Sequence, residues 1–304
     1  MKIWVAVTDR DWFRHLSNLA PDEVNFWQPS AERAAVTLEP GAPFLFKLHA
    51  KDGGRIVGGG YFAHYTRLPV HLAWDAFGQK NGAATLVQMT TRISRYRKGP
   101  IDPESHVVGC FLLAEPFFLD GADAIHVPAG WAQNIVQGRT YDTTTVEGAA
   151  LWASVERARA GGAHRVVRED PARYGAPAWT VVRLGQGIFR SMVTDAYSRR
   201  CAITGERTLP VLEAAHIRSY ANDGPHSVDN GLLLRADLHT LFDRGYITVT
   251  TDLTVRVSPR IRDEFENGRD YYALDRRRIA TPAHQLSAPR PEFLQWHGDV
   301  VFRP

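Results

Sequence analysis

The chain has 304 residues, more than a single domain usually holds, so two domains are expected. Its composition, 44% hydrophobic and 23% charged, is that of a globular protein and not of a disordered or fibrous one. No run approaches the roughly eighteen apolar residues that span a bilayer. The start, MKIWVAVTDRDW, carries charges too early for a signal peptide, so a cytoplasmic protein with no membrane partner is expected.

The pattern of apolar and turn residues predicts an α/β arrangement in the first half of the chain. Thr8 and Asp11 are spaced as a capping box that opens a helix, and three consecutive glycines at 58–60 indicate a bulge or a close backbone approach. Gly161 and Gly162 are expected to end the helix that begins at residue 144. Predicted strands lie at 3–7, 44–48, 56–62 and 107–113, and predicted helices start after 8 and cover 82–96 and 144–162. We expect domains at 1–160 and 181–304, joined by a linker at 161–180.

Two cysteines, Cys110 and Cys201, lie far apart and cannot form a CxxC zinc ribbon. Buried, reduced thiols are the expected state, and no structural zinc is expected. Basic residues are in slight excess only after residue 150, where 22 Lys and Arg face 18 Asp and Glu. This weakly favours a phosphate-binding C-terminal part.

The segment from Cys201 to Val257 carries the strongest functional signal. A strand at 211–217 contains His216, a polar loop follows, and Asn230 precedes a second apolar strand at 232–234. A helix beginning near Asp237 then places His239 and Asp243 one turn apart on one face. Such spacing gives a metal two ligands from one rigid element. A hairpin at 246–257 closes the module. The single histidines His226, His284 and His297 are expected to be structural.

This order of elements, with LEAAHI followed by NGLLLRADLHTLFDRG, resembles the HNH family of nucleases. The resemblance implies a ββα-metal nuclease domain that hydrolyses phosphodiesters. It assigns His216 as the general base, Asn230 as the residue that holds the loop, and His239 and Asp243 as ligands of one divalent metal ion, Mg²⁺ or Mn²⁺. Many HNH nucleases have an acidic residue or histidine directly before the base, where this chain has Ala215, so only two protein ligands are expected.

Arginines and glycines near this module are candidates for phosphate contacts. Arg218 follows the base and Arg235 precedes the helix, although both are equally well explained as solvated surface residues. Gly185 and Gly187, at a predicted helix start, suit either the approach of a phosphate or packing against the module.

The N-terminal half resembles, more loosely, the PUA-like superfamily, which contains the SRA, EVE and YTH readers of modified bases. The pattern is a tryptophan segment at 25–27, a turn at 38–41, a strand, and a glycine-rich strand. A barrel-like reader of this kind flips a base between aromatic faces. Candidate pocket residues are Trp27, Tyr61, Tyr65, Trp74 and Asp75, and candidate phosphate contacts are Arg92, Arg95 and Lys98. The alternatives are core aromatic residues, a helix cap at Asp75, and a solvated basic helix face.

Taken together, the two resemblances imply an α+β protein of the modification-dependent restriction endonuclease kind. Its expected substrate is double-stranded DNA with 5-methyl- or 5-hydroxymethylcytosine, and a homodimer would cut both strands. Two alternatives stay open: an HNH nuclease whose first domain reads sequence, shape or RNA, and an inactive nucleic-acid-binding protein.

Overall fold

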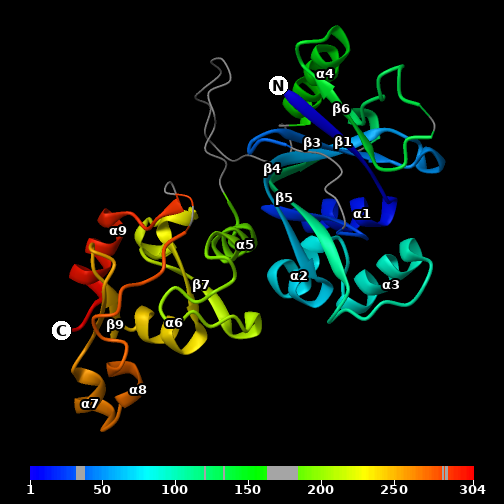
Figure 1. Cartoon of the computed structure of the whole chain (residues 1–304). Coiled ribbons are helices and arrows are strands. Elements are labelled where there is room, and N and C mark those ends of the chain that lie inside the picture. The colour runs from blue at the N-terminus through cyan, green and yellow to red at the C-terminus, as the bar shows by residue number, and fades with distance from the viewer. Residues whose placement is uncertain (32–37, 120, 133, 163–183, 283, 285–286) are drawn as a thin grey trace. The chain divides into compact units, whose positions relative to one another are not determined.

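A computed structural model describes residues 1–304 except 32–37, 120, 133, 163–183, 283 and 285–286. The chain divides into two compact units, Met1–Ile188 and Phe189–Pro304, coloured blue to green and green to red in Figure 1. The linker predicted at 161–180 lies outside the described residues apart from 161–162, which end a helix. No helix among the described residues is long and apolar enough to cross a membrane.

The first unit is built on a mixed sheet with the strand order β2-β5-β4-β3-β1-β6. Only β1 and β3 are parallel; the other neighbouring pairs are antiparallel. Among the described strands β2 and β6 form open edges, so the predicted barrel is not found as a closed structure. The strands are β1 (Lys2–Thr8), β2 (Glu23–Gln28), β3 (Pro43–Leu48), β4 (Ile56–Pro69), β5 (Val107–Phe118) and β6 (Gly138–Asp142).

Alternation along the strands gives this sheet two buried faces. Phe44 and Phe46 of β3 pack with Trp12 of helix α1 (Arg10–Leu19), whereas Leu45 packs on the opposite face with Leu151 of helix α4 (Val146–Gly162). Because both faces are covered, β3 is buried throughout and, apart from Lys47, apolar instead of alternating. Two further helices, α2 (Val70–Phe77) and α3 (Leu86–Arg97), lie between β4 and β5 in the chain.

The glycine run in β4 is required by close backbone contact, as the sequence predicted. A Cβ at Gly58, whose φ is +153°, would lie 2.3 Å from the Phe117 carbonyl oxygen. At Gly59 a Cβ would lie 2.7 Å from the Phe44 carbonyl oxygen. The β4–β5 register also shifts between Gly59 and Tyr61, which is the expected irregularity.

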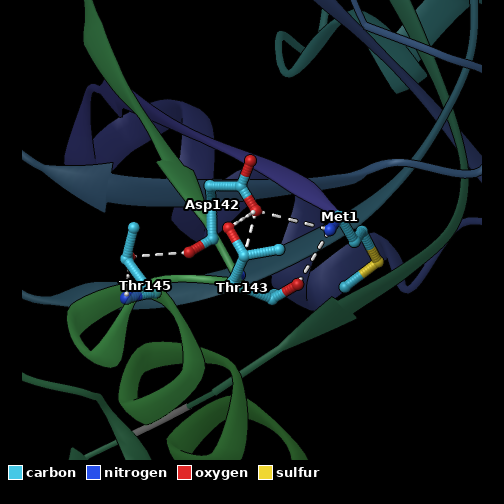
Figure 2. Close-up of polar contacts among 6 residues, drawn as sticks. Met1, Asp142, Thr143 and Thr145 are labelled. Atoms are coloured by element: carbon cyan, nitrogen blue, oxygen red, sulfur yellow. Dashed lines mark hydrogen bonds and ion pairs between the residues drawn. The ribbon is translucent and has the colours of Figure 1, made fainter.

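Helix α1 begins one residue later than the predicted capping box implies. Asp9, not Thr8, is the N-cap of α1, and its side chain makes no capping hydrogen bond. Ahead of α4, Thr145 Oγ1 accepts a hydrogen bond from the Gly148 amide at 3.1 Å. In the same turn Asp142 lies 3.5 Å from the Met1 ammonium, which also donates to Thr143 Oγ1 at 2.8 Å (Figure 2).

The second unit has the predicted strand–strand–helix order around one apolar core. The antiparallel strands β7 (Leu212–His216) and β8 (Gly231–Arg235) are followed by α6 (Ala236–Asp243). Fully buried Leu232, Leu233 and Leu234 form much of this core. The remaining elements are α5 (Gln186–Ala196), within which the boundary between the units falls, the hairpin β9 (Ile247–Val249) and β10 (Val255–Val257), α7 (Arg260–Phe265), α8 (Arg269–Tyr272) and α9 (Pro291–Trp296).

Several predictions about single residues in the cores are confirmed. Cys110 and Cys201 are both buried and neither forms a disulfide. His297 is a structural histidine: its ring stacks on Phe242 with centroids 3.6 Å apart, and burial lowers its pKa to about 4.

Candidate functional site

Helix α6 places His239 and Asp243 on one face of the second unit. His239 Nε2 lies 3.3 Å from Asp243 Oδ2, as the spacing of four residues requires. The other ring nitrogen, Nδ1, lies 2.7 Å from Glu213 Oε2 on β7. Burial is the main cause that raises the pKa of Asp243, and the nearby Glu213 adds to it while His239 opposes it. The half-buried ring of His239 therefore has a carboxylate beside each nitrogen: Glu213 at Nδ1 and Asp243 at Nε2.

This donor set fits a hard divalent cation. Two neighbouring ligands of an octahedral ion at 2.0–2.2 Å lie about 3 Å apart, close to the separation of His239 Nε2 and Asp243 Oδ2. Within the described ranges no group of three or more His, Cys, Asp or Glu side chains surrounds a common centre. The side chains present thus suit an ion that keeps water and substrate oxygens among its ligands.

Ala215 has no side-chain atom that could bind a metal, and it is fully buried opposite Leu232 of β8. Glu213, two residues earlier, shares its face of the strand and reaches the helix. The carboxylate that faces α6 therefore lies two positions before the place where many HNH nucleases have one.

His216 ends β7 opposite Gly231 of β8. Its ring stacks face to face on Phe189, with centroids 3.8 Å apart and an interplanar angle of 10°. Gly231 permits this stack, since a Cβ there would lie 3.1 Å from the Phe189 ring and 2.5 Å from Val193. Burial, followed by the nearby His226 and His239, lowers the pKa of His216 to about 4. The ring is thus neutral at neutral pH and able to accept a proton.

Asn230 holds the loop that joins the two strands. Its side chain is fully buried, accepts a hydrogen bond from the Arg218 amide at 2.9 Å, and donates to the carbonyl oxygens of Arg218 and Pro225, both at 2.9 Å. The Ile217 amide also donates to the Asn230 carbonyl at 2.9 Å. These bonds fix the backbone immediately after His216.

Asn230→Ala is expected to destabilise the protein by about 2–4 kcal/mol, because buried backbone groups that lose their partner each cost about 1–3 kcal/mol. The change would be measured as the free energy of unfolding in urea. Asn222→Ala is the matched control, since Asn222 is exposed in the same loop and bonds only Ser219 Oγ with its side chain. Equal stability of the two variants would contradict this role of Asn230.

The two arginines predicted to contact phosphate beside this site are engaged within the chain. Arg218 donates to the Asn222 carbonyl oxygen at 2.6 Å and lies over the Trp296 ring at 5.6 Å. Arg235 forms two hydrogen bonds with the Asp237 carboxylate, at 3.0 and 2.6 Å. A phosphate contact by Arg235 would compete with this ion pair.

The predicted base-pocket residues do not come together in the first unit. Tyr61 accepts a hydrogen bond from Arg159 of α4, whereas Tyr65 packs against Phe111 in the cluster on the other face of the sheet. Trp27 is half-buried and donates to the Asn81 carbonyl oxygen at 2.9 Å. Trp74, half-buried, and Asp75, exposed, lie within helix α2, so Asp75 is not a helix cap.

A cavity of about 280 Å³ opens elsewhere in the first unit. Arg10, Arg14, Asp52 and Arg55 supply its charged lining. None of the five predicted pocket residues is among the residues that line it.

Of the three basic residues predicted to contact phosphate near the end of α3, one is hydrogen-bonded within the chain and two are exposed. Arg92 donates to the Gly82 carbonyl oxygen. Arg95 and Lys98 are exposed at the end of the helix, where Lys98 is the C-cap. Positive charge at this end of a helix is favourable for the helix itself.

Two backbone amides in the first turn of α5 are already bonded to a carboxylate. The amides of Gly187 and Ile188 donate to the two carboxylate oxygens of the buried Glu23, each at 2.9 Å. Glu23 also pairs with Lys80 at 2.9 Å. Of the two alternatives for Gly185 and Gly187, packing is the observed one.

Sequence reasoning missed two residues of the site. Glu213 is a lone carboxylate within an apolar strand, which is a usable signal for a site on that strand. The sequence predicts a structural role for His226, yet its Nδ1 lies 2.9 Å from His216 Nε2. The residues around His226 do not predict this contact, because it depends on the path of the loop that Asn230 holds.

Comparison with known proteins identifies part of this unit. Residues 201–250 match the model of an HNH endonuclease family. Among solved structures, the ZmASCH protein from Zymomonas mobilis, in a mutant form, is 11% identical with a TM-score of 0.34, over 50% of this chain and 97% of that one. A modification dependent TagI restriction endonuclease is 15% identical with a TM-score of 0.26, over 91% of this chain and 74% of that one. No curated protein matches the chain. Residues 201–250 are therefore an HNH endonuclease segment, which suggests that the protein is a nuclease.

Proposed function

We propose that the protein is a metal-dependent DNA endonuclease whose active site is formed by β7, the loop held by Asn230, and α6. The observation that carries the proposal is the grouping of a neutral, stacked His216 with the His239–Asp243 pair in one unit. A general base that is unprotonated at neutral pH and a two-ligand cation site are the two parts that phosphodiester hydrolysis needs.

In the proposed reaction His216 takes a proton from a water molecule. The electron pair of the broken O–H bond stays on that oxygen, which bonds to phosphorus as the P–O3′ bond breaks. The electron pair of that bond leaves with O3′, which takes a proton from solvent to become the 3′-hydroxyl. His239 Nε2 and Asp243 would hold the cation, and Glu213 would orient the His239 ring through Nδ1. A bound divalent cation neutralises negative charge that develops on the phosphate and on the leaving oxygen.

The first unit is proposed to select DNA that carries 5-methyl- or 5-hydroxymethylcytosine by flipping that base. Its separate core and the exposed Arg95 and Lys98 at one helix end support a role in DNA binding. Since one such site cuts one strand, double-strand cleavage requires a homodimer or two binding events.

The full chain carrying His216→Ala allows binding to be measured without cleavage. We expect it to bind a duplex with modified cytosine about ten times more tightly than the unmodified duplex, because one additional carbon group in a fitted apolar pocket is worth about 1–3 kcal/mol. Titrations of matched duplexes with cytosine, 5-methylcytosine or 5-hydroxymethylcytosine test this directly. Changing Arg95 and Lys98 to Gln should weaken binding to all three duplexes alike and reduce the salt dependence. Equal affinity for the three duplexes would refute the reader and leave the nuclease proposal in place.

A further inference from the structure

His226 contacts the ring of His216 at the site described above. It lies in the loop between β7 and β8, half-buried, and its Nδ1 is 2.9 Å from His216 Nε2. The two rings meet edge to face, with centroids 4.9 Å apart and an interplanar angle of 67°. On its own face His226 stacks on Tyr220, with centroids 4.7 Å apart and an angle of 20°.

These contacts leave Nδ1 as the ring nitrogen of His216 that can accept a proton from water. One face of its ring is covered by Phe189 and its Nε2 is taken by His226. Among the described residues no hydrogen bond is found at His216 Nδ1. Any proton that His216 accepts from a water molecule must therefore go to Nδ1.

The proton between the two rings decides whether His216 can act as a base. A neutral imidazole has one N–H donor and one acceptor nitrogen. If His216 Nε2–H donates to His226 Nδ1, the lone pair of His216 Nδ1 is available. If His226 Nδ1–H donates instead, His216 carries its proton on Nδ1 and its only lone pair is occupied. The first arrangement alone permits general-base catalysis.

We propose that His226 is a positioning residue that accepts the Nε2–H of His216 and so keeps the lone pair on His216 Nδ1. The inference rests on the proposed function, because the tautomer matters only if His216 removes a proton from water. Tyr220 and Phe189 each cover one of the two rings, so the hydrogen bond joins two rings that are both held by stacking. Once His216 Nδ1 has taken the proton, His226 Nδ1 still accepts the hydrogen bond from Nε2–H of the imidazolium.

Two substitutions separate hydrogen bonding from packing. His226→Phe keeps an aromatic ring on Tyr220 but has no acceptor, and His226→Gln keeps an acceptor oxygen but has no ring. We expect the Phe variant to lose about 10- to 100-fold in kcat, the range typical for losing a partner that orients a metal-ligating histidine, with KM and metal affinity unchanged. The Gln variant should restore most of the rate. A fully active Phe variant beside an impaired Gln variant would show that His226 only packs.

The tautomer is read directly by NMR on the full chain labelled with ¹⁵N-histidine, without metal or DNA. Long-range ¹H–¹⁵N spectra distinguish Nδ1–H from Nε2–H, and His216→Gln assigns the signals. We expect the Nε2–H tautomer of His216 in the wild type and in His226→Gln. In His226→Phe we expect a mixture of the Nδ1–H and Nε2–H tautomers. Nδ1–H in the wild type would overturn the inference. A wild type with Nε2–H that cleaves no DNA would instead contradict only the proposed function.

Discussion

His216→Ala is expected to lower the rate of DNA cleavage by about 10²–10⁴-fold, the range that a positioned general base contributes. The substitution removes the imidazole that stacks on Phe189 and leaves the His239–Asp243 pair untouched. The measurement is the single-turnover rate on a plasmid substrate with saturating Mg²⁺. DNA and Mn²⁺ affinities serve as controls and should not change. A variant that cleaves at the wild-type rate would remove His216 from the mechanism.

The pH dependence of DNA cleavage by the wild type is a second test of His216 as the general base. Burial, with His226 and His239 nearby, lowers the pKa of His216 from 6.5 to about 4. A general base works in its unprotonated form, so a lowered pKa extends its working range toward acid pH. We expect kcat to fall with a midpoint below 6.5 as the pH decreases, at saturating metal. A midpoint above 6.5 would contradict the neutral state assigned to His216.

His239→Ala is expected to weaken metal binding by more than 100-fold and to reduce cleavage to the background rate. Of the two side chains that would hold the cation it supplies the imidazole, whereas loss of a residue that only orients a ligand costs about 10- to 100-fold. Glu213→Gln should therefore fall in that smaller range, because Glu213 contacts the ring at Nδ1. Affinities are measured by Mn²⁺ titration followed by EPR, which needs no substrate.

Asp263→Asn is the control for this series, since Asp263 is an exposed carboxylate on α7. It should bind Mn²⁺ as the wild type does. Wild-type affinity in His239→Ala would place the cation elsewhere. An effect of Glu213→Gln as large as that of His239→Ala would make Glu213 a direct ligand.

The order of elements in the nuclease segment could be predicted because local patterns carry it. Three leucines at 232–234 predicted a buried strand, and residues 211–217 predicted the strand that precedes it. His239 and Asp243 are four residues apart on one helix, so their contact follows from helix geometry alone. By contrast, the contacts of Glu213 and His226 join residues 26 and 10 positions apart, and the local sequence does not determine them.

The first unit was harder to predict because its aromatic residues serve two cores. Tyr61 and Tyr65 are four positions apart on β4, yet register shifts at Gly59/Tyr61 and Phe62/His64 lie around them and they pack on opposite faces. The apolar run that contains Trp74 and Asp75 gave no period that separates helix from strand, and it forms α2. Edge strands β2 and β6 also leave the sheet open, which the strand pattern alone did not exclude.

The most direct test of the nuclease proposal is cleavage by the purified full chain. Plasmid DNA with and without 5-methylcytosine or 5-hydroxymethylcytosine is incubated with Mg²⁺ or Mn²⁺, and in parallel with EDTA or with the His216→Ala protein. We expect nicked or linear DNA in the presence of either cation, and intact DNA with EDTA or with the variant. Undiminished cleavage in EDTA, or intact DNA of every kind with both cations, would contradict the account.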